Sequence, residues 1–551
     1  MKSRLFLSLI IPALAACFLN SCTSEAQETL EVSPASISFE ATGNENKVLK
    51  VTTNASDWSF VNSSWIEGSK SGDELVVNWK DNTALSPREG WLRVSAGAAE
   101  PVVVKVTQKA AEPQQPSGEP VSLVSVNGVT DIKVKDENEI TLSVAVSLPS
   151  PAENSVTVKL VADYDYLDAF NKSDLYHFRK AVLLESGRVT LPENVTVTIP
   201  AGRSESEALS VKVDVSGFAY DERHLLPLSL EVVENAAVSD EGRANFVLTR
   251  PKPIKNVVIY EVNETNPLNT LEYKLEDGSY FFDSAVLFSS NIIDRDGEPR
   301  LSNNANVQAL LDQCAVYVQP LRDAGIKVYL GLLGHHTIAG LGNLSDKGAR
   351  LFAEEVAEAC YIYGLDGVFL DDEYTSYPET PKNDNYTDAS LYAAGRLCYE
   401  LKRAMKMKCP WETEVSYWVY GNFRTILYPV VDDGVEHPVS SFIDIVLPGY
   451  GGVGRRYADL TNANCGVAAY ELNKGSVPRG ELGSAVADGY GYCMWFCFHP
   501  SDKGTISNNL NRSLGGFRDA AQAFYGQTVL DPKNYYDKLG EGSFDPNPHA
   551  F

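Results

Sequence analysis

Residues 363–374 read Tyr-Gly-Leu-Asp-Gly-Val-Phe-Leu-Asp-Asp-Glu-Tyr. The short apolar run indicates a strand buried on both faces, and carboxylates follow where that strand ends. Because strand side chains alternate, we expect Asp371 and Glu373 to face the same way, roughly 6–7 Å apart along the strand. Two carboxylates on one face repel each other, so the more enclosed one should keep its proton and be able to protonate a leaving oxygen. The stretch therefore predicts a strand of a larger sheet with a pair of reactive carboxylates at its end.

The sequence around this stretch repeats the same kind of short apolar run. Longer amphipathic stretches, such as residues 307–324 and 349–363, separate the runs. Eight runs that alternate with helical stretches over residues 251–527 predict a (β/α)8 barrel, whose active site lies at the carboxyl ends of its strands. Residues 528–551 form a tail without a clear period. The expected strands are residues 257–262, 285–289, 328–333, 367–370, 414–420, 442–447, 466–470 and 490–498.

Two blocks of short strands precede this barrel. Residues 31–109 and 121–250 alternate apolar and polar side chains between turn residues, which predicts a β-sandwich for each block. Residues 110–120 carry three prolines and form a hydrated linker between the blocks. We therefore expect a multidomain protein, in which an α/β TIM-barrel catalytic domain is preceded by two all-β sandwich domains.

The N-terminus has the features of an export signal. Lys2 and Arg4 precede a largely apolar run of 15 residues, Leu5–Leu19, which is too short to span a membrane but fits a signal peptide over residues 1–21. The junction at Cys22 resembles a lipobox, in which this cysteine is lipidated and residues 22–30 form a tether. The alternative is an ordinary secretory signal with an incidental cysteine. We expect an exported protein, lipid-anchored in the outer membrane or at the cell surface.

Charge and cysteine content narrow the class of partner. The chain has 73 acidic and 47 basic residues, a formal charge of −26, which disfavours nucleic acids and anionic lipid surfaces and leaves a neutral partner such as a sugar. Seven of the nine cysteines lie after residue 313 at irregular spacing, so we expect buried small side chains rather than disulfides. Cys493 and Cys497 lack the second pair of a metal signature. We expect a monomer with no cofactor and no metal.

The carboxylate stretch resembles a known family signature. Residues 366–373 are similar to the Asp-x-x-Asp-x-Asp-x-Glu motif of glycoside hydrolase family 18, and residues 363–374 are similar to its endo-β-N-acetylglucosaminidases. The resemblance implies cleavage of the chitobiose core of N-linked glycans, free or on glycoproteins, between its two N-acetylglucosamines. Residues 31–109 resemble a BACON domain, for which we favour a spacer role over glycan binding. The residues that match a BACON domain are Trp58, Trp65 and Arg88. Further matches to family 18 are residues 260–263, 325–328, 332–336, Asn343 and 490–492.

The mechanism that the resemblance implies is substrate-assisted. Glu373 would protonate the glycosidic oxygen while the acetamide of the substrate attacks the anomeric carbon, which forms an oxazolinium ion. Asp371 would orient the acetamide and stabilise its positive charge, Tyr450 would hydrogen-bond it, and Trp495 would form an aromatic floor beneath the sugar. Water deprotonated by Glu373 would then open the ring with retention. Further candidates for substrate contacts are Glu261, Asn263, His335, Tyr374 and Tyr420.

One position departs from the motif. Phe369 stands where the family has its second Asp. Asp371 should therefore ionise more readily, unless burial beside Phe369 offsets the change. Two alternative functions stay open: a catalytically inactive barrel that binds glycans at the cell surface, which only Phe369 supports, and a chitinase of the same family.

Three other patterns have competing interpretations. Residues 449–454 match Gly-x-Gly-x-x-Gly after a strand, but residues 455–463 are too short for the helix of a dinucleotide-binding fold. His335 and His336, with the nearby carboxylates, suggest a metal site. Neighbouring strand residues point opposite ways, however, so at most one of these histidines should face the barrel. Trp418 and Tyr420 are either barrel core or glycan contacts.

Overall fold

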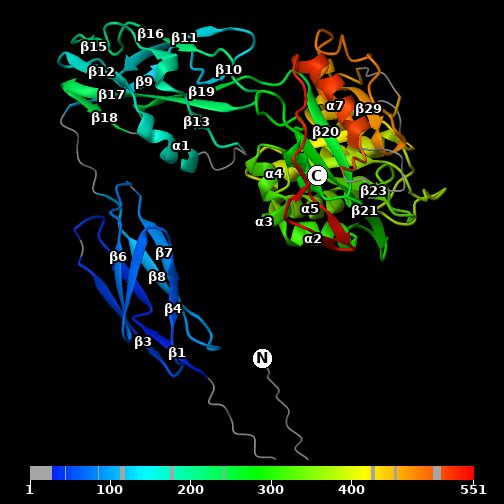
Figure 1. The fold of residues 1–551 in the computed structure, drawn as a ribbon, viewed down its shortest axis with the longest axis horizontal. Coiled ribbons are helices and arrows are strands. Elements are labelled where there is room, and N and C mark those ends of the chain that lie inside the picture. The colour runs from blue at the N-terminus through cyan, green and yellow to red at the C-terminus, as the bar shows by residue number, and fades with distance from the viewer. Residues whose placement is uncertain are drawn as a thin grey trace, which may run out of the picture. The chain divides into compact units, whose positions relative to one another are not determined.

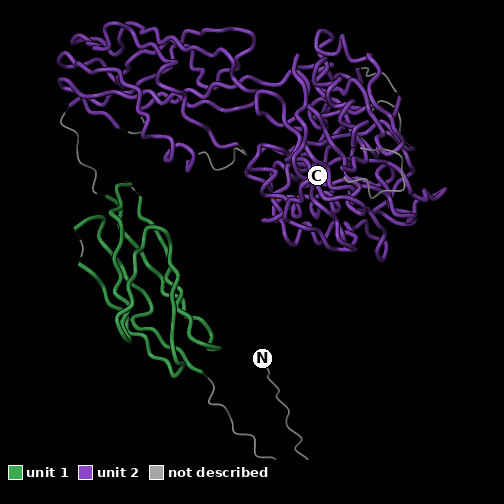
Figure 2. The backbone as a smooth tube through the Cα atoms, in the orientation of Figure 1, with its two compact units in different colours: residues 1–116 green, residues 117–551 purple. Residues whose placement is uncertain are grey.

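The computed structural model describes residues 28–43, 45–84, 86–111, 118–173, 179–239, 242–422, 428–451, 456–500 and 510–551. The expected signal peptide, Cys22 and the centre of the expected linker lie outside the described residues. The chain forms two compact units, residues 1–116 and residues 117–551 (Figure 2). Among the helices in the described ranges, none is long and apolar enough to cross a membrane.

The first unit consists of two four-stranded sheets around one core. One sheet has the order β1-β3-β6-β5 and the other the order β2-β8-β7-β4. The buried side chains, among them Leu49, Leu75 and Val104, form one hydrophobic cluster, to which Trp58 also belongs. The strands are β1 (Leu30–Ser33), β2 (Ser36–Phe39), β3 (Lys47–Thr53), β4 (Ser59–Asn62), β5 (Ile66–Ser71), β6 (Glu74–Trp79), β7 (Arg88–Ser95) and β8 (Val102–Gln108).

The second unit begins with another pair of sheets. Their orders are β10-β19-β17-β12-β15, with β13 beside β17, and β14-β16-β11-β9-β18. Val144, Val158 and Phe246 are part of the larger core cluster of this region, and Ala181, Leu225 and Val247 form a smaller one. Its elements are β9 (Glu119–Ser125), β10 (Asp131–Lys133), β11 (Glu139–Ser147), β12 (Val156–Ala162), α1 (Leu167–Ser173), β13 (Val182–Leu183), β14 (Val189–Thr190), β15 (Thr196–Ile199), β16 (Leu209–Asp214), β17 (Arg223–Glu234), β18 (Ala236–Val238) and β19 (Ala244–Thr249).

Eight parallel strands form the centre of the remaining part of the second unit (Figure 1). Their order is β28-β25-β24-β23-β21-β20-β30-β29, and every neighbouring pair is parallel. Val446 of β28 forms a parallel bridge with Cys465, the residue before β29, so the pairing continues around the whole set. The strands are β20 (Lys255–Glu261), β21 (Ser284–Arg295), β23 (Lys327–Gly334), β24 (Gly367–Asp371), β25 (Glu414–Trp418), β28 (Ile445–Leu447), β29 (Gly466–Glu471) and β30 (Tyr492–Phe496), and β22 (Glu298–Ser302) extends β21 as a hairpin.

The alternating side chains of these strands fill two separate cores. Phe369 and Met494 belong to the core on one face, whereas Val368 and Trp495 belong to the core that the helices cover. Because both faces are buried, the strands are apolar throughout, as is usual for parallel sheets. The helices are α2 (Ala305–Asp312), α3 (Cys314–Tyr317), α4 (Gln319–Asp323), α5 (Asp346–Tyr363), α6 (Leu391–Lys408) and α7 (Leu510–Tyr525).

Local sequence explains where the helices begin and end. The Ser345 hydroxyl accepts a hydrogen bond from the Gly348 N–H at the start of α5, and Gly364 ends that helix with φ +67°. The helix expected over residues 307–324 is divided into α2, α3 and α4, and Pro320 lies in the first turn of the last, where proline is tolerated. Helices follow β21, β23, β24 and β30, whereas the described segments after the other four strands hold 3-10 turns or short strands.

The C-terminal tail packs onto the second unit. It forms two small paired elements, β31 (Asn534–Tyr535) with β34 (His549–Ala550) and β32 (Lys538–Gly540) with β33 (Ser543–Phe544). The Asn266 side chain donates hydrogen bonds of 3.1 and 2.9 Å to the carbonyls of Asp537 and Asp545. These bonds fix the tail against the segment that follows β20.

Candidate active site

A cavity of about 480 Å³ lies at the carboxyl ends of the parallel strands. This is the end of the sheet at which the sequence placed the active site. Most of the strands contribute the residue at which they end, and neighbouring loops supply the rest. The strand-end residues that line the cavity are Glu261, Gly334, Asp371, Trp418, Glu471 and Phe496.

Strand β24 brings two carboxylates into this cavity. Asp371 is its last residue and only 2% exposed, while Glu373 follows it and is half-buried. Both line the cavity. Asp372, between them, instead accepts a hydrogen bond from the Tyr377 hydroxyl and does not line the cavity. The alternation that the sequence predicted for this stretch is therefore observed.

Phe369 faces the interior of the strand set, below Asp371. Its ring is fully buried, and its centroid lies 6.1 Å from that of Phe288 and 6.0 Å from that of Trp418. The position that holds the second Asp of the motif is thus filled by an apolar ring, in a core made of other apolar side chains.

Burial dominates the electrostatics of Asp371. Desolvation, followed by the charges of Glu373, Asp372 and Glu261, raises the pKa of Asp371 to about 8. Its Oδ1 atom has no hydrogen-bond partner among the described residues. Asp371 does not ionise more readily beside Phe369, because burial offsets the missing neighbour, which is the exception that the sequence left open.

A third carboxylate adds to this negative environment. Glu261 ends β20 and lines the same cavity. Burial, and then the charge of Glu264, raises the pKa of Glu261 to about 7. The pKa of Asp372 is also raised, to about 6, by burial, although hydrogen bonds from Tyr377 and Asn422 act in the opposite direction. Asp371, Glu261 and Asp372 therefore keep their protons at higher pH than ordinary carboxyls do.

Aromatic side chains form one wall of the cavity. The ring of Trp418 stacks on that of Tyr420 at 4.4 Å and on that of Phe496 at 5.8 Å, and its indole N–H donates to the carbonyl of Pro448 at 2.9 Å. Trp418 is thus both packed in the core and part of the cavity lining.

Tyr450 stands at the edge of this wall. Its ring lies edge-on to Trp418 at 5.0 Å. Burial, helped by the charges of Glu471 and Asp371, raises the pKa of the Tyr450 phenol well above its usual range, so its hydroxyl stays protonated and can donate a hydrogen bond.

Trp495 does not line the cavity, and its predicted role as a floor is wrong. Its side chain is fully buried on the helix-facing side of β30, where the indole N–H donates to Asn256 Oδ1 at 2.8 Å and the ring packs edge-on against Phe517. Phe496, the next residue, points to the cavity instead. The alternation in Met494-Trp495-Phe496 puts Trp495 on the face opposite its two neighbours, but it does not tell which of the two faces meets the cavity.

Both histidines line the cavity, which corrects the expectation that at most one would. Strand β23 ends at Gly334, and His336 has a left-handed φ of +54°, so the strand alternation no longer applies there. The ring of the exposed Tyr374 lies edge-on to His336 at 5.4 Å. In the described part of the chain, neither histidine belongs to a group of three potential metal ligands.

The other predicted contact residues also lie at the cavity. Tyr374, Tyr420, Glu261 and Asn263 are among its lining residues, and Asn263 Oδ1 accepts a hydrogen bond of 2.7 Å from Asn306. The glycine run of residues 449–454 is described only as far as Gly451, and no α-helix lies in the described residues that follow it before β29. Lining residues that the sequence did not indicate are Phe288, Ser289, Asn291, Asn304, Leu333, Glu471, Lys474 and Phe496.

Comparison with known proteins indicates the family of the chain. The chain is 37% identical over 319 residues, 57% of its own length and 90% of the relative, to the Elizabethkingia meningoseptica protein named endo-β-N-acetylglucosaminidase F1. It is 42% identical over 137 residues, 25% of its length and 43% of the relative, to an endo-β-N-acetylglucosaminidase of Flavobacterium sp. strain SK1022.

A solved structure and a family model match the chain as well. A crystal structure of Bacteroides thetaiotamicron EndoBT-3987 with a Man5GlcNAc product is 29% identical, covers 78% of this chain and 99% of the other, and has a TM-score of 0.48. A family model described as a "-like, N-terminal domain" matches residues 115–237. Since the chain is 37% identical to the F1 protein and covers nine-tenths of that relative, it belongs to the endo-β-N-acetylglucosaminidase family.

Proposed function

We propose that the protein is a glycoside hydrolase of family 18 that cleaves the GlcNAc-β1,4-GlcNAc core of N-linked glycans on a (β/α)8 catalytic domain. The observation that carries this proposal is the presence of Asp371 and Glu373 together in the cavity at the carboxyl ends of the eight parallel strands. The name of the F1 relative, which states an endo-β-N-acetylglucosaminidase activity, supports the choice of substrate.

The proposed reaction is substrate-assisted and retaining. Glu373 protonates the glycosidic oxygen, and the carbonyl oxygen of the substrate's acetamide attacks the anomeric carbon. The glycosidic bond breaks and an oxazolinium ion forms. A water molecule then gives a proton to Glu373 and opens the ring, which restores the original configuration and the protonated acid.

Asp371 orients the acetamide and stabilises the positive charge that forms on it. Its burial supports this role, because a charge interaction is stronger where water is excluded. The reaction needs one proton on the pair: Asp371 holds it in the free protein, and it passes to Glu373, which leaves Asp371 ionised, before the glycosidic oxygen is protonated. The raised pKa of Asp371 supports a pair that still holds a proton at neutral pH. Tyr450, whose hydroxyl stays protonated, donates a hydrogen bond to the acetamide carbonyl.

Trp418 forms the aromatic floor beneath the sugar that was predicted for Trp495. It lines the cavity together with Tyr420 and Phe496. The C–H groups of a pyranose face pack well on an aromatic surface, and the stacked rings of Tyr420 and Phe496 hold the indole in place.

The test is mass spectrometry of two N-glycoproteins, one with high-mannose and one with complex glycans, after incubation with the purified protein. Each cleaved site should keep a single N-acetylglucosamine. Glu373→Gln should abolish turnover but keep glycan binding, whereas Glu379→Gln, an exposed residue on the following loop, should leave turnover unchanged. Near-full activity of the Glu373→Gln protein would overturn the proposal.

The two alternatives give different results in the same experiment. Binding of both glycoproteins without cleavage would indicate an inactive barrel that retains glycans. Cleavage of a free chitin oligomer, with both glycoproteins left intact, would indicate a chitinase. The inactive barrel is not favoured, since both carboxylates of the proposed mechanism lie in the cavity. The chitinase is not favoured, since the relatives are named endo-β-N-acetylglucosaminidases.

We also propose that the protein is an exported lipoprotein, anchored through Cys22, that acts as a monomer and without nucleic acid. The leader sequence supports export, and the two sheet-rich regions before the barrel would act as spacers, the first of them BACON-like. Metabolic labelling with a radioactive fatty acid should label the wild-type protein and not the Cys22→Ala variant. Labelling of both would exclude this anchor.

A further inference from the structure

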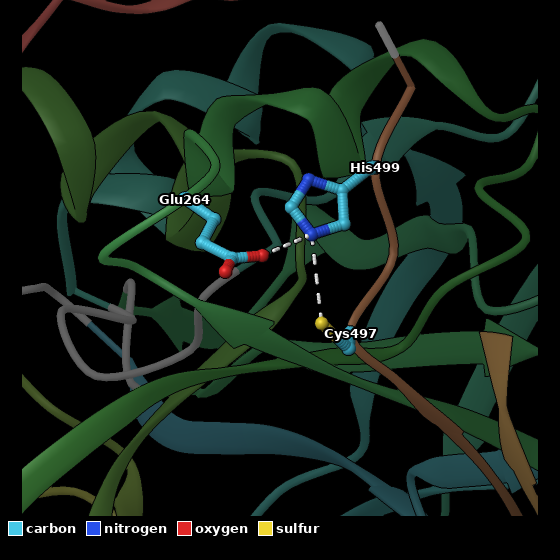
Figure 3. A group of neighbouring side chains, drawn as sticks. All are labelled: Glu264, Cys497 and His499. Carbon is cyan, nitrogen blue, oxygen red and sulfur yellow. Dashed lines mark hydrogen bonds and ion pairs between the residues drawn. The ribbon is translucent and has the colours of Figure 1, made fainter. Parts of the chain in front are cut away.

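Three side chains that commonly bind transition metals meet beside the cavity. The Nε2 atom of His499 lies 2.9 Å from Glu264 Oε2 and 3.5 Å from Cys497 Sγ. Figure 3 shows the carboxylate and the sulfur pointing to this same ring nitrogen. None of the three residues lines the cavity of the candidate active site, so the cluster is a separate feature.

The backbone around the cluster is fixed by the central sheet. Cys497 directly follows β30, has a left-handed φ of +58°, and its N–H donates to the carbonyl of Ile259 in β20 at 2.9 Å. Glu264 lies in a turn directly after β20, where its N–H donates to the Glu261 carbonyl at 2.8 Å. Since β20 and β30 are hydrogen-bonded neighbours, the two ligands are positioned by paired strands.

The spacing of the three ligand atoms suits a tetrahedral zinc-type ion. At usual zinc–ligand bond lengths, a ligand nitrogen and sulfur lie about 3.5 Å apart, and a nitrogen and oxygen about 3.3 Å apart. The first distance matches the 3.5 Å between His499 and Cys497. The second needs only a small movement of Glu264, whose side chain is 56% exposed and can adjust.

Without a cation, the ring nitrogen of His499 can satisfy only one of its two neighbours in the cluster. A single ring nitrogen either donates its one hydrogen or accepts one, but here it faces both a carboxylate oxygen and a thiol. If the ring nitrogen carries a proton, it donates that proton to the carboxylate and has no lone pair left for the thiol. If it does not, its lone pair faces the carboxylate. A metal ion removes the conflict, because all three lone pairs then point to one positive charge.

The surroundings favour a cation as well. Glu261, Glu264 and Glu471 all lie close enough to Cys497 to act on its thiol electrostatically. The side chain of Asn473 hydrogen-bonds Cys497, and its Oδ1 atom is buried without a partner among the described residues. Neighbours that hydrogen-bond a ligating atom are typical of the outer shell of a metal site.

We propose that Glu264, Cys497 and His499 bind a divalent zinc-type cation, with water completing the fourth position. Three protein ligands and one open position are a known arrangement for zinc. The ion ties the segment after the first strand to the segment after the last and takes no part in the proposed hydrolysis. The sequence did not predict this site because Glu264 is more than two hundred residues from the other two ligands.

The test uses cobalt(II), a spectroscopic substitute for zinc. The purified protein is dialysed against a chelator, transferred to metal-free buffer and titrated with CoCl2. We expect one equivalent of cobalt to bind, with a sulfur-to-cobalt charge-transfer band and the visible bands of a tetrahedral ion, and ZnCl2 should displace it. X-ray absorption of the zinc-loaded protein should show one sulfur ligand.

Variants assign the ligands. Cys497→Ser should remove the charge-transfer band, and Asn473→Ala should weaken cobalt binding by about 10–100-fold. His549→Ala is the matched control, because His549 also contacts a carboxylate, Asp545, at 3.0 Å, yet belongs to no metal-ligand group in the described chain. It should bind cobalt as the wild type does.

Three results would overturn the proposal. The first is a folded wild-type protein that shows no charge-transfer band. The second is a band that persists in Cys497→Ser. The third, which holds even if a variant does not fold, is a zinc coordination sphere without sulfur in the wild-type protein.

Discussion

Replacing Asp371 with Asn should change how stability depends on pH. The substitution keeps the shape of the side chain and removes its titration. In the folded protein burial raises the pKa of Asp371 to about 8, from an ordinary value of 3.8. Between these two values the folded state keeps the proton and the unfolded chain loses it. The stability of the wild-type protein therefore falls as the pH rises, and it does so only within this window.

The size of the effect follows from the linkage relation. One group that is protonated in the folded state and ionised in the unfolded state lowers the free energy of unfolding by about 1.4 kcal/mol per pH unit. From pH 5 to pH 7 the wild-type protein should lose about 2.7 kcal/mol relative to Asp371→Asn. Any constant difference in packing between the two side chains cancels in this comparison.

The assay is urea unfolding of both proteins at pH 5, 6 and 7, followed by near-ultraviolet circular dichroism. The transition of residues 1–116, which the substitution does not touch, serves as an internal reference. Asp519→Asn, an exposed residue on α7, is the control and should show no pH-dependent difference from the wild type. A constant difference for Asp371→Asn between pH 5 and pH 7 would mean that Asp371 is ionised in the folded state, and the burial argument would fail.

Three other predictions concern the same cavity. The kcat/KM for N-glycan cleavage should stay high at neutral pH and fall as the pH rises through about 8, where the Asp371–Glu373 pair loses its shared proton. A kcat/KM that already begins to fall near pH 5 would contradict this protonation of the pair. Trp418→Ala should raise KM strongly, whereas Trp495→Phe should leave KM unchanged. Trp495→Phe should instead lower the free energy of unfolding by about 1–3 kcal/mol, because Asn256 loses its hydrogen-bond donor. Equal KM values for the two variants would refute the assignment of the sugar contact to Trp418. Restoring the motif with Phe369→Asp should lower the free energy of unfolding by at least about 3 kcal/mol in urea, because the side chain is fully buried. Phe369→Leu should lower it by less than about 1.5 kcal/mol. Similar losses of stability in the two variants would show that the site tolerates a carboxyl.

The local pattern of the sequence was sufficient for much of the region of eight parallel strands. The apolar runs at residues 328–333 and 367–370 lie in β23 and β24, and the run at residues 257–262 lies in β20 except for its last residue, because strands buried on both faces are apolar throughout. The alternation after Phe369 also placed Asp371 and Glu373 on one face, since both belong to one strand and its direct continuation.

Where a strand ends, the sequence pattern was misleading. His335 and His336 both reach the cavity because the chain leaves the extended conformation after Gly334. The predicted helix over residues 307–324 is divided into three, and its boundaries depend on how the segment packs as much as on Pro320. Such changes of direction come from contacts that a periodic pattern does not contain.

The sequence by itself determined that Asp371 and Glu373 face the same way, because alternation is a property of one strand and needs no partner. Only the tertiary structure decided three other features: Phe496 rather than Trp495 faces the cavity, burial governs the pKa of Asp371, and Glu264 meets Cys497 and His499. The physical reason is the same for all three. The face that a strand turns to the cavity, the water that surrounds a carboxyl and the meeting of distant ligands depend on neighbouring strands, and the closing of the strand set brings those neighbours together from remote parts of the chain.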